Sequence, residues 1–208
     1  MKDFEWENRI IEFWTITGIV TKSEKRSETY VSGNFDKKSK DVNVTSDVVI
    51  KHEFWLKTPD GKEEEIQLSG YDIPLREGQE VSMLLAFPKG GEYSWYVALI
   101  NHSAGKFWWT MDLMRLVDGY LVTSDKRAQW GLERYVLPGI AISAPLFNDS
   151  VFEFYDGFVW MGSVAALFLL CKFRVDVNES RYKSQAHHLL MQHIEGLIQQ
   201  VFQQRNAS

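Results

Sequence analysis

The chain has 208 residues, of which 45% are hydrophobic, 25% charged and 14% aromatic. These fractions are ordinary for a globular protein, so they exclude a wholly disordered chain and a collagen-like repeat. A formal net charge of −5 argues against a general nucleic-acid coat protein. The single cysteine excludes an internal disulfide framework and a cysteine-based zinc site. A mean hydropathy of −0.25 excludes a polytopic membrane protein but allows one or two membrane segments.

The first residues are acidic, where a secretory signal needs a basic start and an apolar core. No export signal is therefore predicted. Phe4, Ile10, Ile11 and Phe13 fall roughly on one stripe, which predicts a short amphipathic helix over residues 4–13.

Residues 14–110 contain five or six short segments in which apolar side chains alternate, about ten residues apart, with no helical period between them. Val81–Phe87 has an apolar residue at every second position, and Val48–Lys57 places Ile50, His52, Phe54 and Leu56 on one face. Turn sequences such as Thr58–Gly61 separate them. The pattern predicts an antiparallel β-barrel domain over residues 1–110, within a mainly β protein that has C-terminal helices (α+β).

The step from Leu75 to Val81 resembles the turn and strand entry of SH3-like and OB-like barrels. An OB fold has a helix between its third and fourth strands, and only residues 71–76 are available for it here. Because Pro74 lies in that stretch, the SH3-like form is favoured.

Two features of this domain are candidate binding surfaces. Residues 22–46 are polar and predict a long hairpin tip, either a solvated loop or a basic contact for phosphates or anionic lipid. The aromatic run at the end of the domain is either a core strand or a stacking platform. The candidate binding residues are Phe107, Trp108, Trp109, Lys37, Lys38 and Lys40.

Residues 111–134 predict a connecting helix, and residues 135–173 an apolar helical hairpin that is a possible membrane anchor. Phe158–Cys171 has neither charge nor proline, but a membrane-spanning helix needs about twenty residues. Extension to Val151–Phe173 reaches that length. The alternative is that these segments, 135–173, are buried in a soluble domain or a subunit interface.

Charge around the two apolar runs is asymmetric. Lys126, Arg127 and Arg134 precede them, and Lys172 and Arg174 follow, whereas the intervening loop is acidic and without Lys or Arg. Since basic residues stay in the cytoplasm, this places both ends of the hairpin inside. The expected location is the cytoplasmic face of a bacterial inner membrane, with the cytoplasm as the alternative.

Residues 174–208 predict an amphipathic helix, capped by Asn178 or Ser180, that forms either a short coiled coil or a helix folded back on the β domain. His187, His188 and His193 are not spaced four apart, so they are predicted to be exposed rather than metal ligands.

The segments 67–79 and 99–105 are similar to segments of uncharacterised bacterial proteins that place a soluble β domain before hydrophobic segments. The resemblance implies an inner-membrane accessory protein and no known activity. No catalytic, cofactor or metal motif is apparent. We therefore expect a membrane-anchored, non-enzymatic binding or scaffolding module with a protein partner or self-association. The alternative is a soluble oligomeric interaction or nucleic-acid-binding protein, and an enzyme is a third hypothesis.

Overall fold

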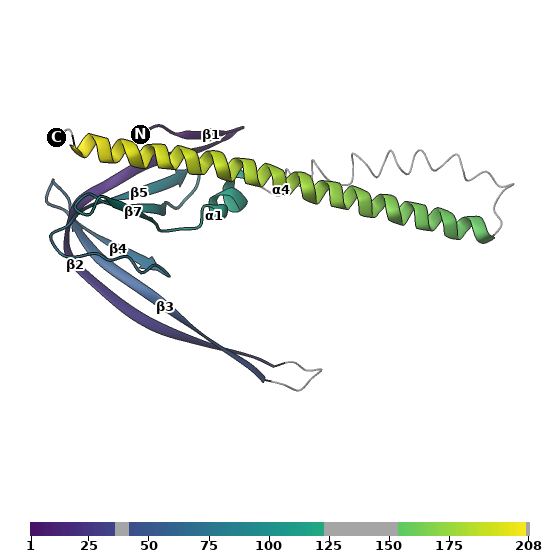
Figure 1. Ribbon diagram of the computed structural model, residues 1–208, viewed down its shortest axis with the longest axis horizontal. Coiled ribbons are helices and arrows are strands. Elements are labelled where there is room, and N and C mark those ends of the chain that lie inside the picture. The colour runs from purple at the N-terminus through teal and green to yellow at the C-terminus, as the bar shows by residue number, and fades with distance from the viewer. Residues whose placement is uncertain (36–41, 123–153, 207–208) are drawn as a thin grey trace. The chain divides into compact units, whose positions relative to one another are not determined.

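The computed structural model describes residues 1–35, 42–122 and 154–206 (Figure 1), and the side chains of residues 1–33, 44–122 and 176–205. These residues form two compact units, one of residues 1–112 with 193–208 and one of residues 113–192.

The first unit contains one antiparallel sheet with the strand order β4-β3-β2-β5-β6-β7, and β1 beside β2. Its strands are β1 (Phe4–Trp6), β2 (Arg9–Phe35), β3 (Val42–Lys57), β4 (Glu63–Ser69), β5 (Glu80–Pro88), β6 (Trp95–Asn101) and β7 (Lys106–Trp109). The mainly β, α+β prediction is confirmed. The prediction of a barrel is wrong, because β4 and β7 end the strand order and do not pair with each other.

Strand β2 belongs to two ladders. Its first half pairs with β5, up to Ile19↔Glu80, and its second half pairs with β3, from Ile19↔Lys57 onwards. A bulge lies between Val20 and Lys22, where the change of partner occurs. At Gly18 an added Cβ would lie 2.7 Å from the carbonyl oxygen of Lys57, so only glycine fits this approach of the two strands.

The main core lies on one face of the sheet and includes residues of both β3 and β5, two strands that pair with β2. Phe54 and Leu56 of β3 pack with Ile66 of β4, and with Met83 of β5, all fully buried. The segment between β4 and β5 adds Ile73 to the same cluster. This irregular segment therefore covers part of the core that further strands would cover in a closed barrel.

The opposite face of the sheet is covered by the C-terminal end of the long helix α4 (Phe154–Asn206), as Figure 1 shows. Ile194, Leu197 and Ile198 are buried there. Arg205 donates from Nε to Glu80 Oε2 at 2.9 Å, and its Nη2 lies 2.7 Å from Oε1. The alternative of a helix folded back on the β domain is confirmed for residues 193–206, and it explains why β5 is buried on both faces.

Helix α4 is one continuous element from Phe154, so the predicted caps at Asn178 and Ser180 are wrong. His193 is also not exposed: its ring lies 5.5 Å from Phe4 and 5.6 Å from Phe13, and its Nε2 is 2.9 Å from the Lys2 carbonyl.

The predicted helix over residues 4–13 is replaced by β1 and the start of β2. Ile11 and Phe13 are buried and alternate with less buried neighbours, which is the period of a strand. The chain reverses at Glu7, which has a φ of 52°.

In the second unit, the described part of the predicted connecting helix comprises α1 (Met114–Leu116) and a π-helical turn η1 (Val117–Leu121). Residues 123–153 lie outside the described residues, so the hairpin of residues 135–173 is not shown beyond the helical backbone from Phe154. Among the described residues, no helix has both the length and the apolar composition needed to cross a membrane.

Candidate functional site: the arm of β2 and β3

The most distinctive surface of the first unit is the part of the β2–β3 ladder that continues beyond β4. We call residues 27–35 of β2 and 42–50 of β3 the arm. Its ladder runs from Ser27↔Ile50 to Phe35↔Val42, whereas the β3–β4 ladder ends at Lys51↔Ser69. Figure 1 shows these two strands extending together past the other strands. At about 3.3 Å per residue the arm is roughly 26 Å long.

One face of the arm is apolar. Because opposite residues of an antiparallel pair share a face, Val31, Ser46, Val44 and Val48 lie on the same side. The three valines are 67%, 64% and 65% exposed at positions 31, 44 and 48. This face continues the core-facing side of β3, where the side chains are completely buried. The apolar surface therefore extends beyond the part of the sheet that β4 and the core cover.

The other face is polar and carries paired charges. Lys51 Nζ lies 2.7 Å from Glu28 Oε2, and Tyr30 donates a hydrogen bond of 2.7 Å to the same oxygen. Nearer the sheet, Glu24 receives both Lys22 and Arg26, at 2.7 and 3.3 Å. These pairs are exposed, so each adds little to stability. Because positive and negative side chains alternate, the described part of this face has no continuous positive potential that would attract a polyanion.

The pKa directions agree with this pairing. The hydrogen bond from Lys51, followed by that from Tyr30, lowers the pKa of the Glu28 carboxyl, and Glu28 raises the pKa of Lys51. The carboxylate and the ammonium are therefore both charged at neutral pH. The polar face is a network of compensated charges rather than a basic patch.

A buried histidine lies where the arm leaves the core. His52 is 1% exposed, its Nε2 lies 2.9 Å from the Ser23 hydroxyl, and its Nδ1 has no hydrogen-bond partner. Burial, followed by the charge of Lys25, lowers the pKa of the imidazole, and Asp72 opposes this effect. Asp72 itself forms an ion pair with Lys25. His52 is thus held neutral at the root of the arm.

A second histidine forms a Ser–His pair that superficially resembles a nucleophile with its base. Ser82 Oγ lies 2.8 Å from His102 Nε2 and 2.6 Å from Thr17 Oγ1. However, Ser82 is completely buried between neighbouring strands, so its hydroxyl does not face a substrate space. The cluster joins β2, β5 and the turn after β6, and its role is structural.

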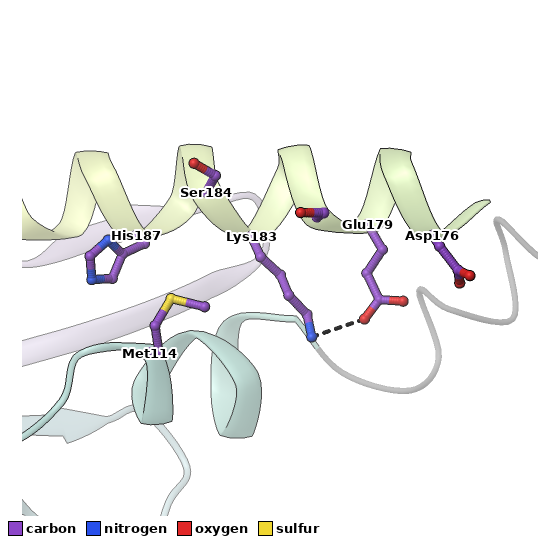
Figure 2. A pocket seen from close by; sticks show the side chains of 7 residues that line it. Met114, Asp176, Glu179, Lys183, Ser184 and His187 are labelled. Carbon is purple, nitrogen blue, oxygen red and sulfur yellow. Dashed lines mark ion pairs between the residues drawn. The ribbon is translucent and has the colours of Figure 1, made fainter. Parts of the chain in front are cut away.

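The second unit contains an open pocket of about 540 Å³ beside α4 (Figure 2). Its lining residues are Met114, Asp176, Glu179, Ser180, Lys183, Ser184 and His187. Lys183 Nζ lies 2.7 Å from Asp118 Oδ1 and 2.9 Å from Glu179 Oε1, and these contacts raise the pKa of Lys183. The cation is already neutralised by two carboxylates, so the pocket is a weaker candidate for anion binding than its composition indicates.

The binding residues predicted from the sequence do not form one surface in the described chain. Trp108 packs against the core cluster, whereas Phe107 and Trp109 contact each other edge to face at 5.8 Å, and all three are partly buried. Lys37, Lys38 and Lys40 lie outside the described residues. No group of three or more His, Cys, Asp or Glu side chains suited to a metal ion occurs among the residues described.

The prediction of a hairpin tip over residues 22–46 misses Val31 and Val44 of the arm, whereas Val48 lies in the predicted segment Val48–Lys57. The signal that could have found Val44 is the alternation of Val42, Val44, Val48 and Ile50. Comparisons with known protein families, with curated proteins and with solved structures gave no match.

Proposed function

We propose that this chain is a membrane-anchored binding module, in which the arm engages a protein partner and residues 135–173 hold the module at a bilayer. The observation that carries the proposal is the exposed apolar face formed by Val31, Val44 and Val48. Contiguous exposed apolar surface on a folded protein marks an interaction site more often than chance.

The size of the available energy supports a partner of protein character. Burying a valine side chain contributes about 1.5 kcal/mol or more. With each of the three about two-thirds exposed, a partner that covers them gains roughly 3 kcal/mol before any hydrogen bond is counted. The free backbone edges of the arm supply those hydrogen bonds to an added strand.

A protein partner also fits the arm better than a nucleic acid does. Four cations of the ladder, Lys22, Lys25, Arg26 and Lys51, are paired with carboxylates of Glu24, Glu28 or Asp72. Phosphate binding needs several uncompensated Lys or Arg side chains. The apolar face, by contrast, can bind a protein surface without breaking any of these ion pairs.

Support for the membrane anchor comes from the sequence of residues 135–173 and its basic flanks. Fractionation of cells that express the full chain tests this part. Release by detergent but not by high salt is the expected result. Release without detergent as a monodisperse soluble species would contradict the anchor and would favour burial of residues 135–173 in a subunit interface.

The arm is tested by site-specific photo-crosslinking in the same cells. A photoreactive amino acid at Val31 lies on the apolar face, and one at Ser32 lies next to it on the polar face. Adducts with protein from position 31, and few or none from position 32, are expected. Equal adducts from both positions, or none from either, would reject the arm as the binding element.

A further inference from the structure

The outer edge of β3 in the arm is an unprotected strand edge. Ile50 accepts a hydrogen bond of 2.8 Å from the Gly70 N–H, and this is the last backbone bond between β3 and its outer neighbour. In a strand, alternate residues direct both N–H and C=O to the same side. Ser46, Val44 and Val48 therefore point these groups away from β2, and no other described strand pairs with them.

The β3 edge of the arm lacks the usual protection of an exposed strand edge. Strand edges that stay solvent-exposed are usually guarded by charges or proline. Within the arm, β2 carries one charged residue, Glu28, and a glycine at position 33. Between Val44 and Ile50, β3 carries only Asp47 and has neither proline nor glycine. The β3 edge is thus open to an added strand.

We infer that the strand added at this edge is β3 of a second copy of this chain, paired antiparallel about a two-fold axis at Ser46. This inference rests on the proposed function, since it identifies the first partner of the arm. A two-fold axis normal to the sheet keeps the apolar faces of both copies on one side. Even-numbered residues of one copy then lie opposite even-numbered residues of the other, and odd-numbered residues opposite odd-numbered ones.

The register at Ser46 is favoured by its side-chain pairs. In this register Val44 of each copy lies opposite Val48 of the other copy, and the two Ser46 residues lie opposite each other. All three are positions whose backbone groups point outward, so the pairing forms about six N–H···O bonds. A register centred one residue later places the two Asp47 carboxylates directly opposite each other, which is unfavourable. The dimer presents the valine face of both arms as one surface to the wider partner.

Disulfide trapping tests the register in the detergent-solubilised full chain, with Cys171→Ala as the background. In a hydrogen-bonded antiparallel pair the Cα atoms are about 5.5 Å apart, within the range of a disulfide. Ser46→Cys is expected to give a covalent dimer on mild oxidation. Ser27→Cys is the matched control, because Ser27 lies on the same face of β2 and its two copies are more than about 14 Å apart.

Two further variants test the dimer by sedimentation. Ser46→Pro removes an outward N–H without removing a bond to β2, and it is expected to weaken dimerisation about tenfold or more. Asp47→Asn removes a repulsion between the diagonally placed carboxylates and is expected to tighten the dimer about threefold.

A monomer at all concentrations, with no Ser46→Cys dimer, would overturn the inference. Equal trapping at Ser27 and Ser46 would also overturn it. If Val31 still crosslinks to another protein in that case, the proposed function stands and only the identity of the partner is wrong.

Discussion

Substitution of Gly18 by alanine tests how the arm is connected to the sheet. Gly18 lies in β2 opposite Val81 of β5, just before β2 changes its partner to β3. An added Cβ would meet the Lys57 carbonyl oxygen at 2.7 Å, its carbon at 3.0 Å and Leu56 Cβ at 3.3 Å. The nearest obstacles are backbone atoms, which no side-chain rotation can move aside.

The cost of this substitution follows from the overlap. Relief requires a shift of β3 relative to β2, and Leu56 on β3 is fully buried in the core. Forcing an extra carbon into such packing costs typically about 1–3 kcal/mol. For a chain of this size each kcal/mol lowers the melting temperature by about 2–4 °C. We expect Gly18→Ala to lower the stability by about 2 kcal/mol.

The assay is denaturant unfolding of the full chain in detergent, followed by tryptophan fluorescence, with Gly33→Ala as the control. Gly33 lies in the same strand, and an added Cβ there would have no atom within 4 Å. The control is expected to be neutral, or more stable by up to about 1 kcal/mol, because alanine restricts the unfolded chain. Equal effects at both positions, or a stabilising Gly18→Ala, would refute the proposed close approach.

Three further substitutions test the packing around the sheet. Burial lowers the pKa of His52, so on acidification the unfolded chain binds a proton more readily than the folded chain does. The contribution of His52 to stability is therefore complete above about pH 6.5 and declines as the pH falls. Unfolding measured as a function of pH should show a smaller decline for His52→Gln. Ile194→Ala should cost about 2–5 kcal/mol of unfolding free energy, since the side chain is fully buried. Arg205→Ala should cost less than about 1 kcal/mol, because its pair with Glu80 is partly exposed; a larger cost than that of Ile194→Ala would contradict apolar docking of α4.

The strands of the sheet could be predicted from the sequence because their faces are chemically different. In β3 the buried Phe54 and Leu56 alternate with less buried neighbours, and the turn after Lys57 contains proline and glycine. Closure of the sheet could not be predicted, since whether β4 meets β7 depends on long-range curvature. The local alternation of side chains is the same in an open sheet and in a barrel.

The arm and the N-terminal strands were missed for a different reason. A two-stranded ribbon with solvent on both faces tolerates charges at many positions, so Lys22–Glu28 looks like a loop by composition. At the N-terminus, the apolar residues between positions 4 and 13 are too few to distinguish a helical stripe from a strand. The pairing Phe4↔Ile11 that decides between them involves a second strand, which local periodicity does not report.

The most direct test of the central claim, that the apolar face of the arm is covered in the cell, is cysteine accessibility in isolated membranes. Val31→Cys and Ser32→Cys, each with Cys171→Ala, are exposed to a water-soluble maleimide before and after denaturation. Both neighbouring positions are solvent-exposed in the isolated chain. We predict slow labelling at position 31 and fast labelling at position 32 in membranes. Equally fast labelling at both positions would contradict the account.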